Sequence, residues 1–259
     1  MPALLVDDRD GVRTLTLNRP ESFNSLTVEL KELLLAALTE AGTDPSVRAV
    51  VLTGAGKAFC AGQDLKEHVA ALRAEDPTPF ETVAKHYNPI VRALTGMPKP
   101  VIAAVNGMAA GAGASFAYAC DLRVAAPSAK FLMAFATIGL TADSGASWTL
   151  PRLVGYGRAM ELMLLANPVT AEQALAVGMI TQVADDALAT AHELAARMAT
   201  GPTTGYGKIK EALLVGAGAD LESALACEGA GQNLLGGTSD HREAVDAFVA
   251  KREPTFTGR

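Results

Sequence analysis

The chain has 259 residues, of which 49% are hydrophobic and only 5% aromatic, so one large domain or two small ones must pack on Ala, Val and Leu. The formal net charge of −6 argues against a surface that binds nucleic acid. Three widely spaced cysteines and four histidines show neither a disulfide framework nor metal-ligand spacing, and residues 1–20 show no signal-peptide pattern, so we expect a reduced, metal-free, cytoplasmic protein without a membrane partner.

Short apolar runs alternate with helical patterns over the first two-thirds of the chain. Residues 12–17 alternate threonines with apolar residues, which indicates a strand, and residues 27–39 carry apolar side chains at helical spacing. Further short strands are predicted at residues 48–53, 101–105, 122–126 and 131–134. Because helical segments separate most of these strands, we predict an α/β fold with a mostly parallel sheet.

The remaining segments differ from this alternation. Residues 69–80, which include Pro77 and Pro79, are predicted to be the least regular part of the chain. After residue 170 strands nearly vanish, and Ala-rich helices are predicted at residues 185–200, 204–215, 219–234 and 239–251. Helices of this kind carry apolar faces that need a partner.

Two glycine-rich loops each follow an apolar strand and precede a helix. The first reads AGQDL at residues 61–65, and the second reads GMAAGAG at residues 107–113. Glycine permits positive φ and close approach, and a helix start leaves unpaired N–H groups at the positive end of its dipole. One such turn is often merely structural. Two N–H groups that converge on one oxygen, however, form an oxyanion hole that stabilises an enolate or a tetrahedral intermediate.

Together these loops resemble those of the crotonase superfamily, also called enoyl-CoA hydratase/isomerase. The resemblance extends from LTLNRP at residues 15–20 to AFVAKR at residues 247–252. It implies a crotonase (ClpP-like) spiral of ββα units in residues 1–195, which hold the acyl-CoA site, and a C-terminal helical oligomerisation region in residues 196–259. It also implies a homotrimer, or a hexamer made of two trimers.

The same resemblance implies where an acyl-CoA binds. The hole donors are the main-chain N–H groups of Gln63 and Ala112, which hold the thioester carbonyl oxygen. No cofactor is bound permanently, because the substrate itself is a CoA thioester. The positions that match the family's CoA-binding residues are Ser22, Phe23, Ala61, Gln63, Asp64, Leu65, Gly111, Phe248 and Lys251. Of these, Phe248 and Lys251 reach CoA from a neighbouring helix or subunit.

Charged residues near the first loop have two interpretations. Asp64 is expected to act structurally, at the start of a helix. Arg19, Lys57 and Lys66 are candidates for the CoA phosphates, but single surface cations are usually just solvated.

Asp143 is the candidate proton-transfer group. It lies in GLTADSGASWTLPR, residues 139–152. The local sequence allows either an N-cap for the following helix or a general base whose pKa is raised by apolar surroundings. This motif, YNPIVR at residues 87–92 and the tail from residue 251 resemble the 2-(1,2-epoxy-1,2-dihydrophenyl)acetyl-CoA isomerase type of phenylacetate catabolism, and that resemblance implies a catalytic Asp143.

Family hydratases place two glutamates at the positions that match Ser115 and Phe135. A hydroxyl and a phenyl ring are not carboxylic bases near neutral pH, so we expect poor hydration. The plainer alternatives are a helix serine bonded to its own backbone and a pocket-lining ring. Asn88 is a candidate hydrogen-bonding partner of the substrate, or a turn residue before a proline. Trp148 completes the predicted substrate pocket.

We therefore predict an acyl-CoA isomerase in which Asp143 shuttles one proton, on a 3-enoyl-CoA or on a ring epoxide or oxepin CoA thioester. An aroyl-CoA dehalogenase is one alternative, with Asp143 as nucleophile. Such enzymes resemble this chain at residues 158–164, but they carry His and Trp where it has Asn88 and Phe135. A non-catalytic acyl-CoA binding protein is another alternative, and RNA binding is disfavoured by the net charge of −6.

Overall fold

Two β-sheets organise the computed structural model, which describes residues 1–74, 78 and 80–259. The first sheet has the strand order β1-β2-β3-β5-β7-β10, and its neighbouring strands are parallel except for the antiparallel pair β1–β2. Its strands are β1 (Leu4–Arg9), β2 (Val12–Leu17), β3 (Ala49–Gly54), β5 (Val101–Val105), β7 (Leu122–Ala125) and β10 (Gln182–Val183).

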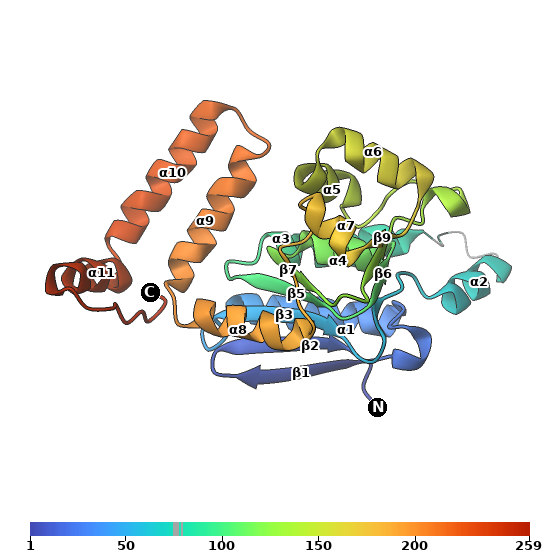
Figure 1. Cartoon of the computed structure of the whole chain (residues 1–259), viewed down its shortest axis with the longest axis horizontal. Helices are drawn as coiled ribbons and strands as arrows, with labels where there is room; N and C mark the ends of the chain where they lie inside the picture. Colours follow the sequence, from blue (N-terminus) through green and yellow to red (C-terminus); the bar gives the residue numbers. More distant parts are fainter. Residues whose placement is uncertain (75–77, 79) are drawn as a thin grey trace.

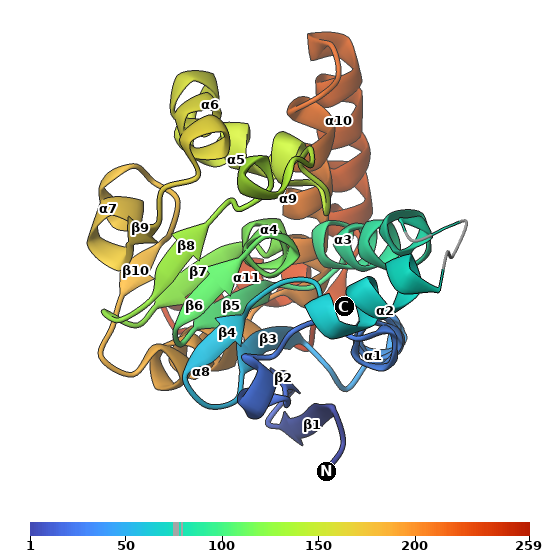
Figure 2. The same cartoon turned by 90° about the vertical axis from the view of Figure 1, so that its right-hand side faces the viewer.

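The second sheet is smaller and has the order β4-β6-β8-β9. Strands β4, β6 and β8 run parallel and side by side, and β9 is antiparallel to β8 (Figure 2). Its strands are β4 (Ala58–Cys60), β6 (Met108–Ala110), β8 (Lys130–Leu132) and β9 (Val169–Thr170). Since parallel neighbours end at the same edge of a sheet, the segments that follow β4, β6 and β8 come together in space.

The helices complete a repeating unit. A strand of the first sheet passes into a strand of the second and then into a helix, in the sequences β3-β4-α2, β5-β6-α4 and β7-β8-α5. This repetition confirms the predicted spiral of ββα units. The helices are α1 (Val28–Thr43), α2 (Leu65–Arg73), α3 (Asn88–Thr95), α4 (Ala112–Ala119), α5 (Ala146–Val154), α6 (Tyr156–Leu165), α7 (Ala171–Ala176), α8 (Ala187–Ala199), α9 (Thr203–Gly216), α10 (Leu221–Gly236) and α11 (Ser239–Ala250).

The strands and helices predicted by residue range are confirmed with small shifts at their ends, whereas the six-residue strand β1 and the short strands β4, β6, β9 and β10 were not predicted. Helix α1 begins where predicted because the Thr27 hydroxyl accepts a hydrogen bond from Leu30 N at 3.2 Å. Strands β4 and β6 lie within segments predicted as loops, since three residues are too few to show a period of two. The prediction of irregular structure at residues 69–80 is wrong over 69–73, which belong to α2, and Pro77 and Pro79 lie outside the described residues.

The first sheet is covered on one face by α8. The helix places Ala187, Ala191, Ala195 and Ala199 in one buried cluster with sheet residues such as Ile102. These alanines recur every four residues, so they form one stripe, and their small side chains let the helix lie close to the strands. Every residue of α4 is buried, and this helix packs beside β4 and β6 of the second sheet.

The C-terminal helices α9, α10 and α11 extend away from the sheets (Figure 1). Arg48 ties them to the core, because its guanidinium donates to Thr203 Oγ1 at 2.9 Å and to Phe256 O at 3.3 Å. Large apolar side chains on these helices are exposed in the single chain, among them Leu213 at 70% and Phe248 at 85%. The division of the chain into residues 1–195 and 196–259 stays a prediction, and α8 spans the boundary it proposes.

Gly113 makes the contact between α4 and β4 possible. A Cβ at this position would lie 2.4 Å from Cys60 O and 2.7 Å from Cys60 Cβ, both on a buried strand that cannot easily shift. We expect Gly113→Ala to lower the free energy of unfolding by about 1–3 kcal/mol, the usual cost of overpacking a core. Urea unfolding followed by circular dichroism measures this change.

Gly229→Ala is the matched control, because Gly229 also lies inside a helix but a Cβ there would meet nothing within 4 Å. At this position, alanine should stabilise the helix by up to about 1 kcal/mol through its higher helix propensity. Equal effects of the two substitutions would contradict the role given to Gly113.

Candidate active site

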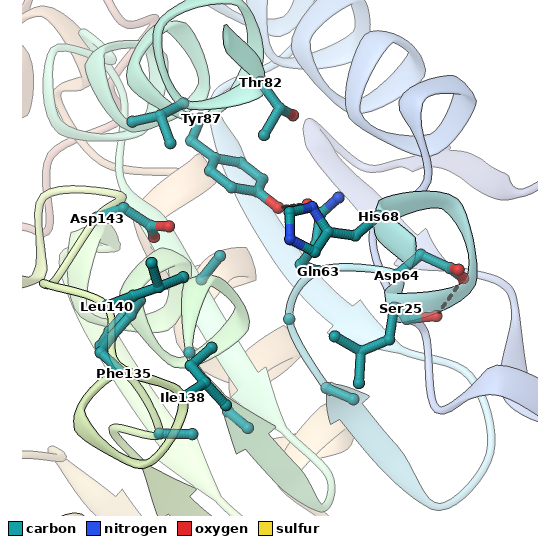
Figure 3. Close-up of a pocket in the computed structure, with 18 of the residues that line it drawn as sticks. Ser25, Gln63, Asp64, His68, Thr82, Tyr87, Phe135, Ile138, Leu140 and Asp143 are labelled. Carbon is teal, nitrogen blue, oxygen red and sulfur yellow. Dashed lines mark hydrogen bonds between the residues drawn. The ribbon is translucent and has the colours of Figure 1, made fainter. Parts of the chain in front are cut away.

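A cavity of about 470 Å³ opens at the edge of the second sheet where β4, β6 and β8 end. Its walls come from the residues after those strands, from helix α2 and from the turn before α3 (Figure 3). The lining residues are Glu21, Ser22, Ser25, Ala61, Gly62, Gln63, Asp64, Leu65, Lys66, His68, Phe80, Thr82, Val83, Tyr87, Ala110, Gly111, Ala112, Ala134, Phe135, Ile138, Leu140 and Asp143.

The first glycine loop presents the N–H of Gln63 to this cavity. Leu26 N donates to Gly62 O at 2.8 Å, and Leu26 O accepts from Asp64 N at 3.3 Å. Leu26 therefore holds the main chain on both sides of Gln63 without bonding to the Gln63 N–H. Within the described residues, no acceptor is present for Gln63 N. Gly62 has φ +88°, and a Cβ there would lie 2.8 Å from Ala110 O, so only glycine fits between the two loops.

The second loop presents the N–H of Ala112. Gly111, with φ +50° and ψ −125°, donates its N–H to Leu132 O at 2.9 Å and turns the chain into α4. Ala112 is the first residue of that helix, and its N–H has no acceptor among the described residues. A Cβ on Gly62 would lie 3.5 Å from Ala112 N, so this amide lies close to the first loop. Two main-chain amides without an acceptor, both from residues that line one cavity, are the groups from which an oxyanion hole is built.

Asp143 lies on the opposite wall of the cavity from Gln63 (Figure 3). Burial raises the pKa of its carboxyl group above the ordinary value, and a hydrogen bond from Ser144 Oγ at 2.8 Å to Asp143 Oδ1 opposes part of that rise. The N-cap interpretation of Asp143 is wrong, because the residue before α5 is Gly145 and no side chain caps that helix. Ser144, the residue after Asp143, has φ +51°, a strained backbone conformation for a residue other than glycine.

The structure separates Ser115 from Phe135. Ser115 is fully buried and its hydroxyl donates to Gly111 O at 2.9 Å, so the backbone-bonded interpretation is confirmed. Its placement in the substrate pocket is wrong, because it does not line the cavity. Phe135 does line the cavity and is 7% exposed, as the pocket-lining interpretation predicts.

Asp64 has the structural role expected of it. It caps α2 by accepting hydrogen bonds from Lys66 N at 3.0 Å and Glu67 N at 3.2 Å, and it pairs with Arg19 Nη1 at 2.8 Å. Burial alone raises the pKa of this carboxyl group, but the hydrogen bonds from Arg19, Ser25 and Glu67 N prevail and bring its pKa to about 2. Asp64 therefore stays ionised beside the cavity, and Arg19 is already engaged with it.

Several predicted site residues do not line the cavity. Trp148, on α5, is 39% exposed, and the Arg152 guanidinium lies 4.0 Å from its ring centroid. Phe23 is 57% exposed. Asn88 begins α3 next to the cavity but does not line it. The other predicted residues outside it are Phe248 and Lys251, together with the candidate phosphate-binding residues Arg19 and Lys57.

Helix α11, which carries Phe248 and ends before Lys251, lies at the opposite end of the molecule from α2 (Figure 1). Within one chain these two residues do not reach the cavity.

Tyr87 is the most prominent site residue that sequence reasoning missed. It is 1% exposed, ends a π-helical turn at Val83–Tyr87, and donates its hydroxyl hydrogen to Gln63 Oε1 (Figure 3). Tyr87 stands in the YNPIVR motif directly before Asn88, so its sequence position marked it as a candidate. Ile138 and Leu140 are two further wall residues that the sequence did not single out, and they make the side near Asp143 apolar.

In the part of the chain that the structure describes, three or more His, Cys, Asp or Glu residues nowhere gather in a way that could hold a metal ion. The described helices also include none that is long and apolar enough to cross a bilayer.

Comparison with known proteins agrees with this geometry. The enoyl-CoA hydratase/isomerase family model matches residues 7–259. The chain is 48% identical over 261 aligned positions to the 1,2-epoxyphenylacetyl-CoA isomerase of Escherichia coli K12, covering all of both chains. It is 37% identical over 220 positions to 4-chlorobenzoyl coenzyme A dehalogenase-2 of an Arthrobacter species, covering 84% of this chain and 80% of that one.

A solved structure of a putative enoyl-CoA hydratase/isomerase from Mycobacterium abscessus superimposes with a TM-score of 0.95 at 44% identity, covering 99% of this chain and 100% of that one. The chain therefore belongs to the enoyl-CoA hydratase/isomerase family, the crotonase superfamily, and has its fold.

The ion pair of Asp64 generates a prediction about acid stability. Because the folded pKa of about 2 lies below the ordinary 3.8, ionised Asp64 stabilises the fold above about pH 4, and this contribution is lost as pH falls toward 2. Asp64→Asn keeps a capping side chain but removes the charge. The difference in urea midpoint between wild type and variant should be constant near neutral pH and shrink below pH 4.

Asp220→Asn is the control, since Asp220 caps α10 through Ser223 N at 2.8 Å on an exposed surface. It should change the midpoint much less. A difference for Asp64→Asn that is the same at pH 3 and pH 7 would show that its charge does not stabilise the fold.

Proposed function

We propose that the protein is an acyl-CoA isomerase that shifts a carbon–carbon double bond through a thioester enolate. One observation carries this proposal: Asp143, a carboxylate whose pKa is raised by burial, lines the same cavity as Gln63 and Ala112, whose main-chain N–H groups have no acceptor among the described residues. A carboxylate of this kind suits proton abstraction near neutral pH, and the amides suit the negative oxygen that abstraction creates.

The reaction follows from these positions. The thioester carbonyl oxygen accepts hydrogen bonds from Gln63 N and Ala112 N. Asp143 takes a proton from C2 of a 3-enoyl-CoA, the C2–H electron pair enters the conjugated system, and the carbonyl oxygen gains negative charge. The protonated Asp143 then delivers the same proton to C4, so a 2-enoyl-CoA leaves and the carboxylate is restored. One group suffices because one proton moves between two carbons.

Hydration needs a different set of groups. Activating water and protonating a carbon take two acid–base residues, and each typically contributes about 10²–10⁴ in rate. Ser115 is bonded to Gly111 O, Phe135 has no proton to transfer, and Asp64 is held ionised by Arg19. We therefore propose that this family member is a poor hydratase.

Dehalogenation is the weaker alternative. The resemblance to aroyl-CoA dehalogenases extends to the aspartate, but those enzymes carry His and Trp at the positions that match Asn88 and Phe135. Here Asn88 lies outside the cavity and Phe135 lines it. Release of halide from 4-chlorobenzoyl-CoA would favour this alternative, and tight binding of acyl-CoA without any turnover would favour a purely binding protein.

The substrate we propose is a CoA thioester with a cyclic acyl group, such as a ring epoxide, with simple 3-enoyl-CoA esters as further substrates. The name of the 48% identical relative supports a ring, as does the apolar wall of Phe135, Ile138 and Leu140 next to Asp143. We propose that the CoA moiety of the bound substrate extends out of the cavity along Ser22, Ala61 and Leu65. We propose no permanently bound cofactor.

The Asp143→Asn variant tests the proposed base. Asparagine has nearly the same size, but it cannot accept the proton, so isomerisation of a 3-enoyl-CoA should fall by at least about 100-fold. Affinity for the CoA ester and the melting temperature should stay close to wild type. Absorbance of the conjugated product measures turnover, and the exposed Asp185→Asn serves as the matched control.

The same assay with a short 2-enoyl-CoA measures hydration. Wild-type hydration at about 10 s⁻¹, an ordinary enzymatic rate, would contradict the isomerase proposal. Near wild-type isomerisation by Asp143→Asn would show that another group is the base.

The assembly is also a proposal. We propose a homotrimer, or a hexamer of two trimers, in which residues 196–259 form the contacts and Phe248 and Lys251 reach the CoA bound by a neighbouring subunit. The exposed apolar side chains of α9, α10 and α11 support this, because such faces are buried against a partner in stable proteins.

Light scattering at micromolar concentration should therefore give three or six times the mass of one chain. Lys251→Ala should weaken CoA-ester binding and leave that mass unchanged. A stable monomer would contradict the proposed assembly, and an unchanged dissociation constant would remove Lys251 from the site.

A further inference from the structure

We propose that Tyr87 is a positioning residue of the oxyanion hole, which acts by holding the side chain of Gln63 and thereby the direction of the Gln63 main-chain N–H. This inference rests on the proposed function, because it assumes that Gln63 N binds the thioester oxygen. The Tyr87 side chain, from the turn before α3, contacts the Gln63 side chain, from the first glycine loop.

The contact joins two segments that are otherwise separate. Gln63 lies between β4 and α2, and its main chain is held through its neighbours by hydrogen bonds to Leu26. The Tyr87 hydroxyl donates to Gln63 Oε1, and both residues line the cavity (Figure 3). A glutamine side chain in a loop loses considerable freedom when it is fixed, so a directed hydrogen bond is needed to keep it in one place.

Tyr87 is itself held firmly. Its ring is 1% exposed and meets the Phe116 ring edge-on, with 6.0 Å between centroids and an interplanar angle of 73°. Lys31 Nζ lies 5.3 Å from the centroid of the Tyr87 ring and donates to Thr82 Oγ1 at 2.7 Å, although Lys31 is only 1% exposed. A buried ammonium over an aromatic ring attracts it, so the lysine fixes both ends of the π-helical turn that carries the tyrosine.

Tyr87 is unsuited to proton transfer. Burial raises the pKa of its hydroxyl far above neutrality, and the nearby Asp143 carboxylate acts in the same direction. The group therefore stays protonated, and its one hydrogen is already donated to Gln63. A neutral donor with an engaged proton fixes geometry instead of supplying a proton, which separates its role from that of Asp143.

Three variants test this role: Tyr87→Phe, Gln63→Met and the double variant. Methionine keeps the length of glutamine and the main-chain N–H, but it removes the oxygen that Tyr87 holds. Loss of a complete hole donor costs about 10²–10³ in rate, so loss of its alignment alone should lower kcat by roughly tenfold in each single variant. KM should change little, since the ground state depends less on the hole.

The double variant distinguishes the mechanisms. If Tyr87 acts through Gln63, then the double variant is no slower than either single variant. If the two reductions multiply, Tyr87 acts directly on the substrate and the proposal is overturned. Tyr118→Phe is the matched control, because Tyr118 is 3% exposed, donates to Met179 Sδ at 3.4 Å, and lies outside the cavity. Its kcat should equal that of wild type.

A spectroscopic measurement keeps the test independent of turnover. The absorption of 4-dimethylaminocinnamoyl-CoA moves to longer wavelength when its thioester carbonyl is polarised. Wild type and Tyr118→Phe should give the full shift, and Tyr87→Phe and Gln63→Met a smaller one with dissociation constants within about threefold of wild type. A full shift in Tyr87→Phe would overturn the proposal.

The two proposals fail in different ways. If wild type shifts the probe but isomerises none of the enoyl-CoA esters, the proposed function fails and the positioning role stands. If Tyr87→Phe does not fold, Gln63→Met decides the question by itself, since its side chain lies in a loop at the cavity. If Gln63→Met gives the full probe shift and the wild-type kcat, then the hydrogen bond between Tyr87 and Gln63 does not position the oxyanion hole, and the proposal is overturned.

Discussion

The close approach of two main-chain loops is the constraint on which the site depends. Two amides serve one oxygen only if the segments after β4 and β6 lie within a few ångströms, and the parallel pairing of these strands brings them to the same edge. Gly62 and Gly113 complete the approach, because a Cβ on either would lie within 3 Å of the neighbouring main chain. The third parallel strand, β8, adds the segment that carries Asp143. The relative positions of the proposed oxyanion-hole amides and of the segment that carries Asp143 therefore follow largely from the backbone.

The two aspartates at the cavity show how surroundings divide the work. Asp64 receives hydrogen bonds from Arg19, Ser25 and the start of α2, so its pKa falls to about 2 and its charge stabilises the fold. At Asp143 the hydrogen bond from the Ser144 hydroxyl offsets only part of the effect of burial, so the pKa of this carboxyl group is raised. One carboxylate is thus kept from protonation and the other is prepared for it. This difference, and not the number of acidic residues, is the reason we propose Asp143 as the base.

The sequence predicted the parts that repeat or that match a motif. The strands at 12–17 and 101–105, the Ala-rich helices and the two glycine loops all have local signals. Strands of three residues have no period, so β4 and β6 were missed. The capping interpretation of Asp143 was wrong because Ser144 and Gly145, both with positive φ, form a turn that delays the start of α5 to Ala146. Tyr87 was missed because its partner Gln63 is 24 positions away, and such contacts exist only in the folded chain.

Enolate formation is the central claim, and exchange of the C2 hydrogens of phenylacetyl-CoA in heavy water tests it most directly. This ester has no double bond to shift, so the measurement isolates proton abstraction from every later step. Proton NMR should show deuterium entering C2 much faster with wild type than in buffer, and no faster than in buffer with Asp143→Asn. Exchange at the buffer rate with wild type, or at the wild-type rate with Asp143→Asn, would contradict the account.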